Sequence, residues 1–219
     1  MIYLYTHFLC MINKRLKLNS VEKTLLSKNI SIFTVSDFSK LFNISLSKAR
    51  LTLSRYSQKE DSHFIRAKNG IYLFTLGNPE NFEIANKIFQ PSYISFETAL
   101  SYYNIIPETI YSITSATTKR PKEIIVQDIN YKYYKLQNRL FFGYRSISIH
   151  QKKIFIAEKE KALLDYIYLV SLKKIAFNQR IDLSKIDRDK LGYYTNYFLK
   201  IIKKDKVFLK TINSIYKNI

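Results

Sequence analysis

The sequence is poor in the residues on which most enzyme signature motifs depend. Its 219 residues include 4 glycines, 3 histidines, 1 cysteine and no tryptophan. The glycines, at positions 70, 77, 143 and 192, are too widely spaced for a GxGxxG turn or a glycine-rich phosphate loop. The GxSxG and HExxH motifs are also absent from the sequence. We therefore expect a protein that is not an enzyme and that needs no cofactor or metal.

The single cysteine, Cys10, cannot form a disulfide within one chain, which fits a reducing cytoplasm. Together with scattered histidines it cannot complete a structural zinc cluster. Residues 1–11 are apolar, but they lack a basic start and a small-residue cleavage site and are too short to cross a bilayer. We expect a cytoplasmic protein with no membrane partner, whose residues 1–11 are an extended start if translation begins at Met11.

Charge of one sign dominates the chain. Lys and Arg number 36 against 17 Asp and Glu, which gives a net charge of +19. Such a charge gives affinity for polyanions, so nucleic acid and anionic membrane surfaces are the first partner classes to consider. The abundance of Lys, Ile, Asn and Tyr also indicates an AT-rich genome, and that bias raises the lysine count without any functional cause.

A cluster of turn residues at positions 77–81 marks the best domain boundary in the chain. We expect residues 1–78 to form one domain and residues 91–219 to form a second. Residues 79–90 are then the linker between them.

The first part is predicted to contain three helices. Short helices are expected at residues 21–26 and after Ser36, whose side chain can cap the second helix. A tight turn follows, and a third helix capped by Ser45 is expected from Leu46 to about Lys59.

A hairpin is predicted after the third helix. Strands at residues 63–67 and 71–76 flank Lys68-Asn69-Gly70, which is a strong turn signal because Asn-Gly tolerates a positive φ. Helix, helix, turn, helix and hairpin in this order are typical of a winged helix-turn-helix, which binds DNA.

The third helix has two distinct sides at about 100° per residue. The apolar side is predicted to pack on the core and consists of Leu46, Ala49, Leu53 and Tyr56. The polar side and its neighbours give the candidate major-groove contacts Ser45, Lys48, Arg50, Thr52, Arg55 and Lys59. The turn of the hairpin adds Arg66, Lys68 and Asn69 as candidate backbone or minor-groove contacts. A solvated helix face and a solvated turn, both common in a lysine-rich protein, are the alternatives.

The second part is predicted to be a mixed α+β domain. A helix capped by Ser95 is expected to run through Tyr103, another from Glu158 to about Leu172, and the tail after Asp187 looks helical. Strands are expected at residues 110–117, 122–126, 131–136, 144–149 and 153–157. The whole chain is therefore predicted to be an α+β protein with an N-terminal winged helix-turn-helix.

A hydroxyl-rich strand in the second part runs into a basic turn. The candidate anion or RNA contacts there are Thr118, Lys119, Arg120 and Lys122. A strand with solvated threonines and a charged loop is the alternative.

Two further groups of side chains favour structural roles. The acids Glu158, Glu160 and Asp165 lie beside lysines on one helix, so pairing within that helix is expected. Tyr131 and Tyr133 could stack on bases, but they share one strand face, where core packing is the commoner outcome.

Three stretches of the second part resemble the AbiEi family of antitoxins. They are Pro91–Tyr103 (PSYISFETALSYY) with the following IPE and YSITSATTKR segments, Phe142-Gly143-Tyr144, and Ile156-Ala157 followed by EKALLD at residues 160–165. The resemblance is specific over about residues 91–169. In the first part it extends only to the general pattern of a winged helix.

The resemblance implies an antitoxin of a type IV toxin–antitoxin module, as in abortive infection of phage-attacked bacteria. In that family a winged helix represses the operon by binding inverted repeats of double-stranded DNA upstream of it. The C-terminal domain antagonises a nucleotidyltransferase toxin, without need for a stable complex. Three alternatives stay open: a winged-helix protein with a nuclease-like second domain, a stand-alone transcriptional regulator, and a module that binds acidic protein or membrane by charge alone.

Overall fold

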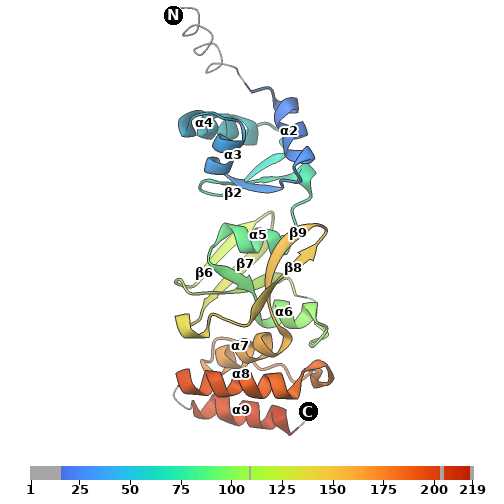
Figure 1. The fold of residues 1–219 in the computed structure, drawn as a ribbon, viewed down its shortest axis with the longest axis vertical. Coiled ribbons are helices and arrows are strands. Elements are labelled where there is room, and N and C mark those ends of the chain that lie inside the picture. Colours follow the sequence, from blue (N-terminus) through green and yellow to red (C-terminus); the bar gives the residue numbers. More distant parts are fainter. Residues whose placement is uncertain (1–15, 109, 203–204, 218–219) are drawn as a thin grey trace, which may run out of the picture. The chain divides into compact units, whose positions relative to one another are not determined.

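The structure is a computed structural model that describes residues 16–108, 110–202 and 205–217. The chain divides into two compact units, with the division between Glu80 and Asn81 (Figure 1). Over the described residues the fold is mixed α+β, with eight α-helices, a three-stranded antiparallel sheet and a six-stranded mixed sheet. The predicted α+β class is thereby confirmed.

The first unit consists of helices that pack on a small sheet. Its elements in chain order are α2 (Leu18–Ser27), β1 (Ile32–Thr34), α3 (Val35–Leu41), α4 (Leu46–Ser57), β2 (Phe64–Lys68), β3 (Ile71–Phe74) and the 3₁₀ turn η1 (Thr75–Gly77). The sheet order is β1-β3-β2, and both pairings are antiparallel. The three predicted helices and the hairpin are present, whereas β1 was not predicted.

Local hydrogen bonds explain where α3 and α4 begin. Thr34 caps α3 in a reciprocal capping box: its Oγ1 accepts from the Asp37 backbone N–H, and the Asp37 carboxylate accepts from the Thr34 N–H at 2.9 Å. The predicted cap, Ser36, therefore lies inside the helix. Ser45 caps α4 as predicted, because its Oγ accepts from the Lys48 N–H at 3.3 Å.

The hairpin turn depends on one glycine. Gly70 has a φ of 79°, the left-handed region that a residue without Cβ adopts at little cost, and the Val35 N–H donates to its carbonyl. The register shifts between Arg66 and Lys68, which is a bulge beside the turn.

The core of the first unit includes side chains from α2, α3 and α4. Its fully buried members include Val21 and Leu25 of α2, Phe38 of α3, and Leu53 of α4. Leu46, by contrast, is 50% exposed although it was predicted to pack. It is the first residue of α4 and lies at the edge of the core-facing side of that helix.

The second unit is built on the larger sheet. Its elements are α5 (Asn81–Ile88), β4 (Ser92–Ile94), α6 (Phe96–Tyr102), β5 (Ser112–Thr117), β6 (Lys122–Val126), β7 (Ile129–Lys135), η2 (Asn138–Leu140), β8 (Tyr144–Ile149), β9 (Lys152–Ala157), α7 (Lys159–Ser171), η3 (Leu183–Lys185), α8 (Arg188–Ile201) and α9 (Lys206–Tyr216). The sheet order is β6-β7-β5-β4-β9-β8, with β4–β9 and β5–β7 parallel.

Helices cover both faces of this sheet. On one face, Tyr131 and Tyr133 of β7 are buried, and the Tyr133 hydroxyl donates to the Ala85 carbonyl of α5 at 2.7 Å. On the other face, Tyr134 packs its ring against Phe96 of α6. Helix α7 packs on α6, and α8 and α9 both pack on α7 (Figure 1). Core packing was therefore the correct expectation for Tyr131 and Tyr133.

The predicted linker over residues 79–90 is mostly helical. Residues 81–88 form α5, which belongs to the second unit and buries Ile84, Ala85 and Ile88 against the sheet. Turn residues at positions 77–80 end the first unit, but the apolar residues that follow are needed to cover a sheet face.

Candidate nucleic-acid interface

Helix α4 is the most basic helix of the first unit. It contains Lys48, Arg50 and Arg55 and no acidic residue, and Lys59 lies two residues after its end. Arg50, Arg55 and Lys59 are exposed, and Lys48 is half-buried. This side of the unit therefore presents cations without competing carboxylates on the same helix, as contact with a polyanion requires.

The outward side of α4 differs from the one predicted. The core-facing side consists of Ala49, Thr52, Leu53 and Tyr56, so the Thr52 side chain, 9% exposed, is not available as a contact. The helix is rotated by a fraction of a turn from the predicted orientation, since Thr52 is buried on its core-facing side and Leu46 is exposed. On the same core-facing side, the Tyr56 hydroxyl donates to the Leu16 carbonyl at 2.8 Å.

This rotation brings forward residues that the sequence reasoning missed. The missed residues on the outward side, exposed or half-buried, are Ser47, Leu51, Ser54 and Gln58, and the predicted contacts Arg50 and Arg55 lie on the same side. Lys48 and Lys59 lie on one flank of that side. The signal that could have found this arrangement is the small size of Thr52, which lets it lie on the core-facing side where a lysine would not be buried.

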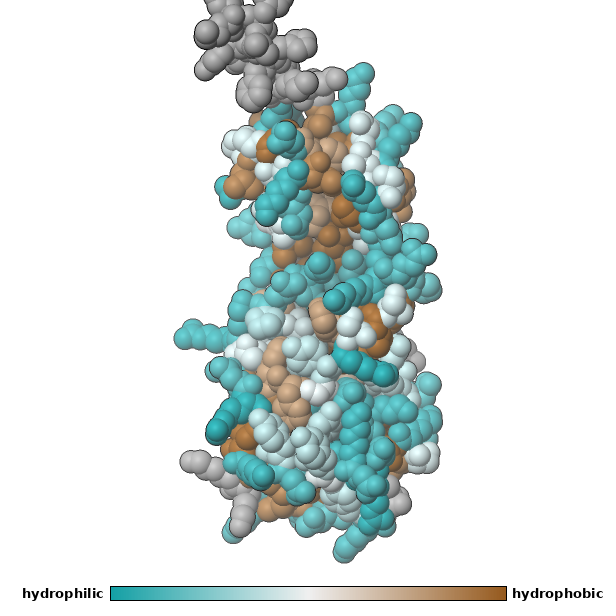
Figure 2. Space-filling model, viewed as in Figure 1, coloured by the Kyte–Doolittle hydropathy of each residue, from teal (hydrophilic) through white to brown (hydrophobic). Residues whose placement is uncertain are grey.

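A hollow lies on the flank of α4 beside the start of α2. Its lining comes from residues 16–18, from Lys48, Thr52, Arg55 and Tyr56 of α4, and from Lys59 beyond the end of that helix. The basic groups at its rim could hold a phosphate, while Thr52 and Tyr56 form an inner wall. Figure 2 shows brown, hydrophobic surface between teal, hydrophilic side chains on the visible face of this unit.

At the hairpin turn, two of the three predicted contacts lie together. The Arg66 guanidinium donates to the Asn69 side-chain carbonyl at 2.9 Å, and both side chains are exposed. Lys68 is half-buried next to them. The hydrogen bond holds the Arg66 side chain across the turn, and the remaining guanidinium N–H groups can still donate to a phosphate.

In the second unit, the predicted hydroxyl-and-basic surface is only half formed. Thr114 and Thr117 are buried, and their hydroxyls donate to the backbone carbonyls of Ser95 and Pro91. Lys119, Arg120 and Lys122 are exposed, and Thr118 is half-buried. The strand hydroxyls thus stabilise the sheet, which leaves a charged turn with the Lys119 ammonium 5.8 Å from the Phe89 ring centre.

The interior of the second unit contains an ion pair. Lys161 and Asp165, one helical turn apart on α7, are both fully buried and in direct contact. The Asp165 carboxylate also accepts from the hydroxyls of Tyr93, at 3.0 Å, and Ser95, at 2.8 Å. Burial lowers the pKa of Lys161 and raises the pKa of Asp165, and each charge opposes the shift of its partner. Pairing within this helix was correctly predicted for Asp165.

Aromatic rings and one glycine enclose the lysine. Its ammonium lies 5.1 to 5.3 Å from the ring centres of Tyr93, Phe142 and Phe198. A Cβ at Gly143, where φ is 66°, would come within 3.0 Å of the Lys161 Cγ. The Phe142-Gly143 pair therefore packs directly on the lysine side chain.

This buried cluster brings together residues from three separate stretches of the second unit. Tyr93 and Ser95 come from the first stretch, Phe142 and Gly143 from the second, and Lys161 and Asp165 from the third. Residues up to about 70 positions apart thus meet at one point. The polar groups of this cluster have an internal structural role, because none of them reaches the surface.

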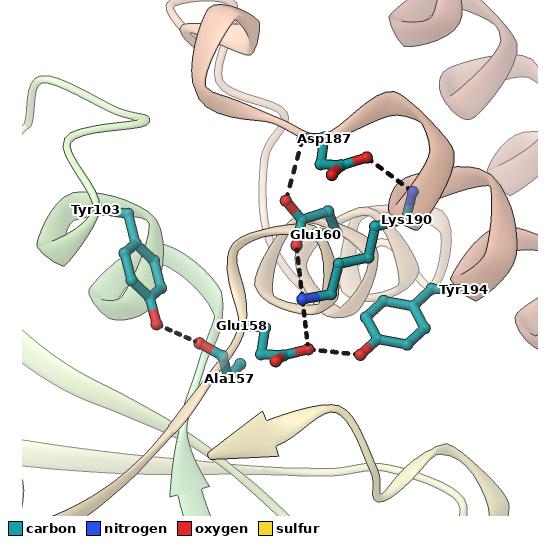
Figure 3. Close-up of polar contacts among 7 residues, drawn as sticks. All are labelled: Tyr103, Ala157, Glu158, Glu160, Asp187, Lys190 and Tyr194. Atoms are coloured by element: carbon teal, nitrogen blue, oxygen red, sulfur yellow. Dashed lines mark hydrogen bonds and ion pairs between the residues drawn. The ribbon is translucent and has the colours of Figure 1, made fainter. Parts of the chain in front are cut away.

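The prediction that Glu158 and Glu160 pair within their own helix is wrong. Their charged partner is Lys190 of α8 (Figure 3). The Lys190 ammonium lies 3.1 Å from the Glu158 carboxylate and 3.8 Å from that of Glu160. The Tyr194 hydroxyl donates to Glu158, and the Asp187 N–H donates to Glu160 at 3.1 Å. These contacts fasten the start of α8 to the start of α7.

The Glu158 contacts predict an acid-sensitive attachment of α8. Burial raises the pKa of Glu158, but hydrogen bonds from Tyr194 and Lys190 and the charge of Lys190 outweigh burial and lower it below 4.5. Because the pKa of Glu158 is lower in the folded state than in the unfolded chain, these contacts stabilise the fold above about pH 4.5 and cease to do so as the pH falls through the folded pKa.

Tyr194→Phe should make the fall in melting temperature at acid pH shallower than in the wild-type chain. Tyr193→Phe, at an exposed neighbour, should leave that fall unchanged. If Tyr194→Phe had the same acid profile as the wild-type chain, this role of the Glu158 contacts would be contradicted.

Among the residues that the structure describes, no group of three or more His, Cys, Asp or Glu side chains is arranged to hold a metal ion. Within the same residues no helix combines the length and the apolar character needed to cross a membrane.

The chain was also compared with known proteins. Neither the models of known protein families nor the curated proteins include a match to it.

Proposed function

We propose that the first unit is a winged helix-turn-helix domain and that the chain represses its own operon by binding inverted repeats in double-stranded DNA. The observation that carries this proposal is the element order α2-β1-α3-α4-β2-β3 with the sheet order β1-β3-β2, in which the helix after the α3–α4 turn is the basic one. In helix-turn-helix proteins the second helix of the pair enters the major groove.

The charge distribution supports the same role for α4. Arg50 and Arg55 are exposed on a helix without acids, so they can reach guanine edges or phosphates. The flanking Lys48 and Lys59 extend this positive surface toward the start of α2. On the hairpin, Arg66 with its partner Asn69 provides a further positive contact for the DNA backbone or the minor groove.

For the second unit, the proposal rests on the resemblance to AbiEi antitoxins. We infer that this unit antagonises a nucleotidyltransferase toxin encoded next to it, without a stable complex between the two proteins and without a reaction of its own. The stretches that carry the resemblance lie around the buried Lys161–Asp165 pair, so they support a shared fold of this unit. The antitoxic surface would then be formed by other, exposed residues.

One experiment in cells tests both halves of the proposal. A reporter gene is placed behind the DNA upstream of this gene, and the neighbouring gene is expressed from a separate promoter. The chain should lower reporter expression and restore growth to cells that produce the neighbouring protein. Repression without rescue would leave a stand-alone regulator, and a reporter that does not respond would contradict the DNA-binding half.

A further inference from the structure

The outward side of α4 has an apolar residue at its centre. Leu51 is 56% exposed, and it points away from the core residues Ala49 and Leu53. Along the helix its neighbours on the same side are Ser47, one turn before, and Ser54 and Arg55, one turn after. An isolated exposed leucine is ordinary on a protein surface. This one, however, lies in the middle of the surface that we propose enters a groove of DNA.

The surroundings of Leu51 allow a close approach to a partner. Ser47 and Ser54 are short, and their hydroxyls already have local partners: Ser47 Oγ lies 3.0 Å from Ser45 Oγ, and the Gln58 amide donates to Ser54 Oγ at 3.5 Å. Leu51 therefore projects beyond both neighbours. Arg50 and Arg55 lie to either side of it and supply positive charge next to the apolar contact.

The major groove offers one apolar group among the four bases, the C5 methyl of thymine. The leucine side chain and the thymine methyl are both apolar and can therefore be in contact. The arginines on either side of the leucine can at the same time bind phosphates or guanines. We propose that Leu51 contacts a thymine methyl and so selects an A·T pair at one position of each half-site. This inference rests on the proposed DNA-binding function.

Replacement of thymine by deoxyuridine tests this contact, because the change removes only the methyl group. The probe is the duplex upstream of this gene, with each thymine replaced in turn, and binding is measured by fluorescence anisotropy. For the wild-type chain, one replacement in each half-site should weaken binding by about threefold to fivefold, as expected for one buried methyl. Leu51→Ala should bind the thymine and deoxyuridine duplexes equally well.

Leu26→Ala is the matched control, because Leu26 is 47% exposed and lies on α2. This variant should keep the wild-type response to every replacement. If Leu51→Ala keeps that response too, or if the wild-type chain is insensitive to all replacements, the assignment of Leu51 is wrong while the DNA-binding proposal stands. If the wild-type chain does not prefer the unmodified upstream duplex to a shuffled one, both are overturned.

Discussion

Asp165→Ala should lower the free energy of unfolding of the second unit by about 3 to 5 kcal/mol, the usual cost of leaving a buried charge without its partner. Lys161 would keep its hydrogen bond to Tyr93, but its ammonium would have no counter-charge in a site with 0% exposure. The Tyr93 and Ser95 hydroxyls would also lose their shared acceptor. Scanning calorimetry of the full chain measures the change.

Two further variants separate this explanation from a general loss of packing. Lys161→Met combined with Asp165→Ala removes both charges and should recover much of the lost stability, because the site is lined by aromatic rings. Asp189→Asn, at an exposed acid on α8, should change stability little. If Asp165→Ala proved as stable as Asp189→Asn, the ion pair would not hold the second unit together.

Reversal of charge on α4 should have the largest effect on DNA binding. Lys48→Glu combined with Arg55→Glu should reduce affinity for the upstream duplex by at least about a hundredfold, or roughly 2.8 kcal/mol, if each lost cation costs about tenfold. The dependence of affinity on salt should also become less steep, because fewer phosphates are neutralised. The melting temperature should stay close to that of the wild-type chain, since Arg55 is exposed and Lys48 only half-buried.

Lys206→Glu combined with Lys210→Glu is the control for this variant. Both lysines are exposed on α9, and the double reversal changes net charge by the same amount. It should leave the preference for the upstream duplex over a shuffled duplex unchanged. Equal losses in the two double variants would mean that net charge, and not the surface of α4, determines binding.

Much of the secondary structure follows from local signals in the sequence. Ser45 marks the start of α4, and strands β6 and β8 have the bounds that alternation predicts. The two strands that were missed, β1 and β4, have three residues each, which is too short for alternation to be visible. Both are positioned by pairing with distant strands, and such pairing leaves no local trace.

The candidate site was predictable in its chemistry but less so in its orientation. The cations of α4 were identified correctly as a group on one helix. The face was misjudged because Leu46 is apolar yet exposed, while Thr52 is polar yet buried beside the start of α2. A helix of 12 residues offers few positions from which to determine its buried side, so one residue at each edge shifts the result.

Polar pairing in the second unit shows the same limit. Lys161 and Asp165 have the spacing of an ordinary surface ion pair, and nothing local indicates that both are buried. Glu158 and Glu160 find Lys190 across about 30 residues of chain, at the junction of two helices. Only tertiary packing decides which of the neighbouring charges pair.

The most direct test of the DNA-binding proposal is fluorescence anisotropy with the duplex upstream of this gene and a shuffled duplex, each at about 50 and 200 mM salt. Sequence-specific reading by α4 predicts a preference for the upstream duplex that persists at the higher salt. Equal binding of the two duplexes, with affinity that collapses as salt rises, would contradict it, because the net charge of +19 would then act on any polyanion.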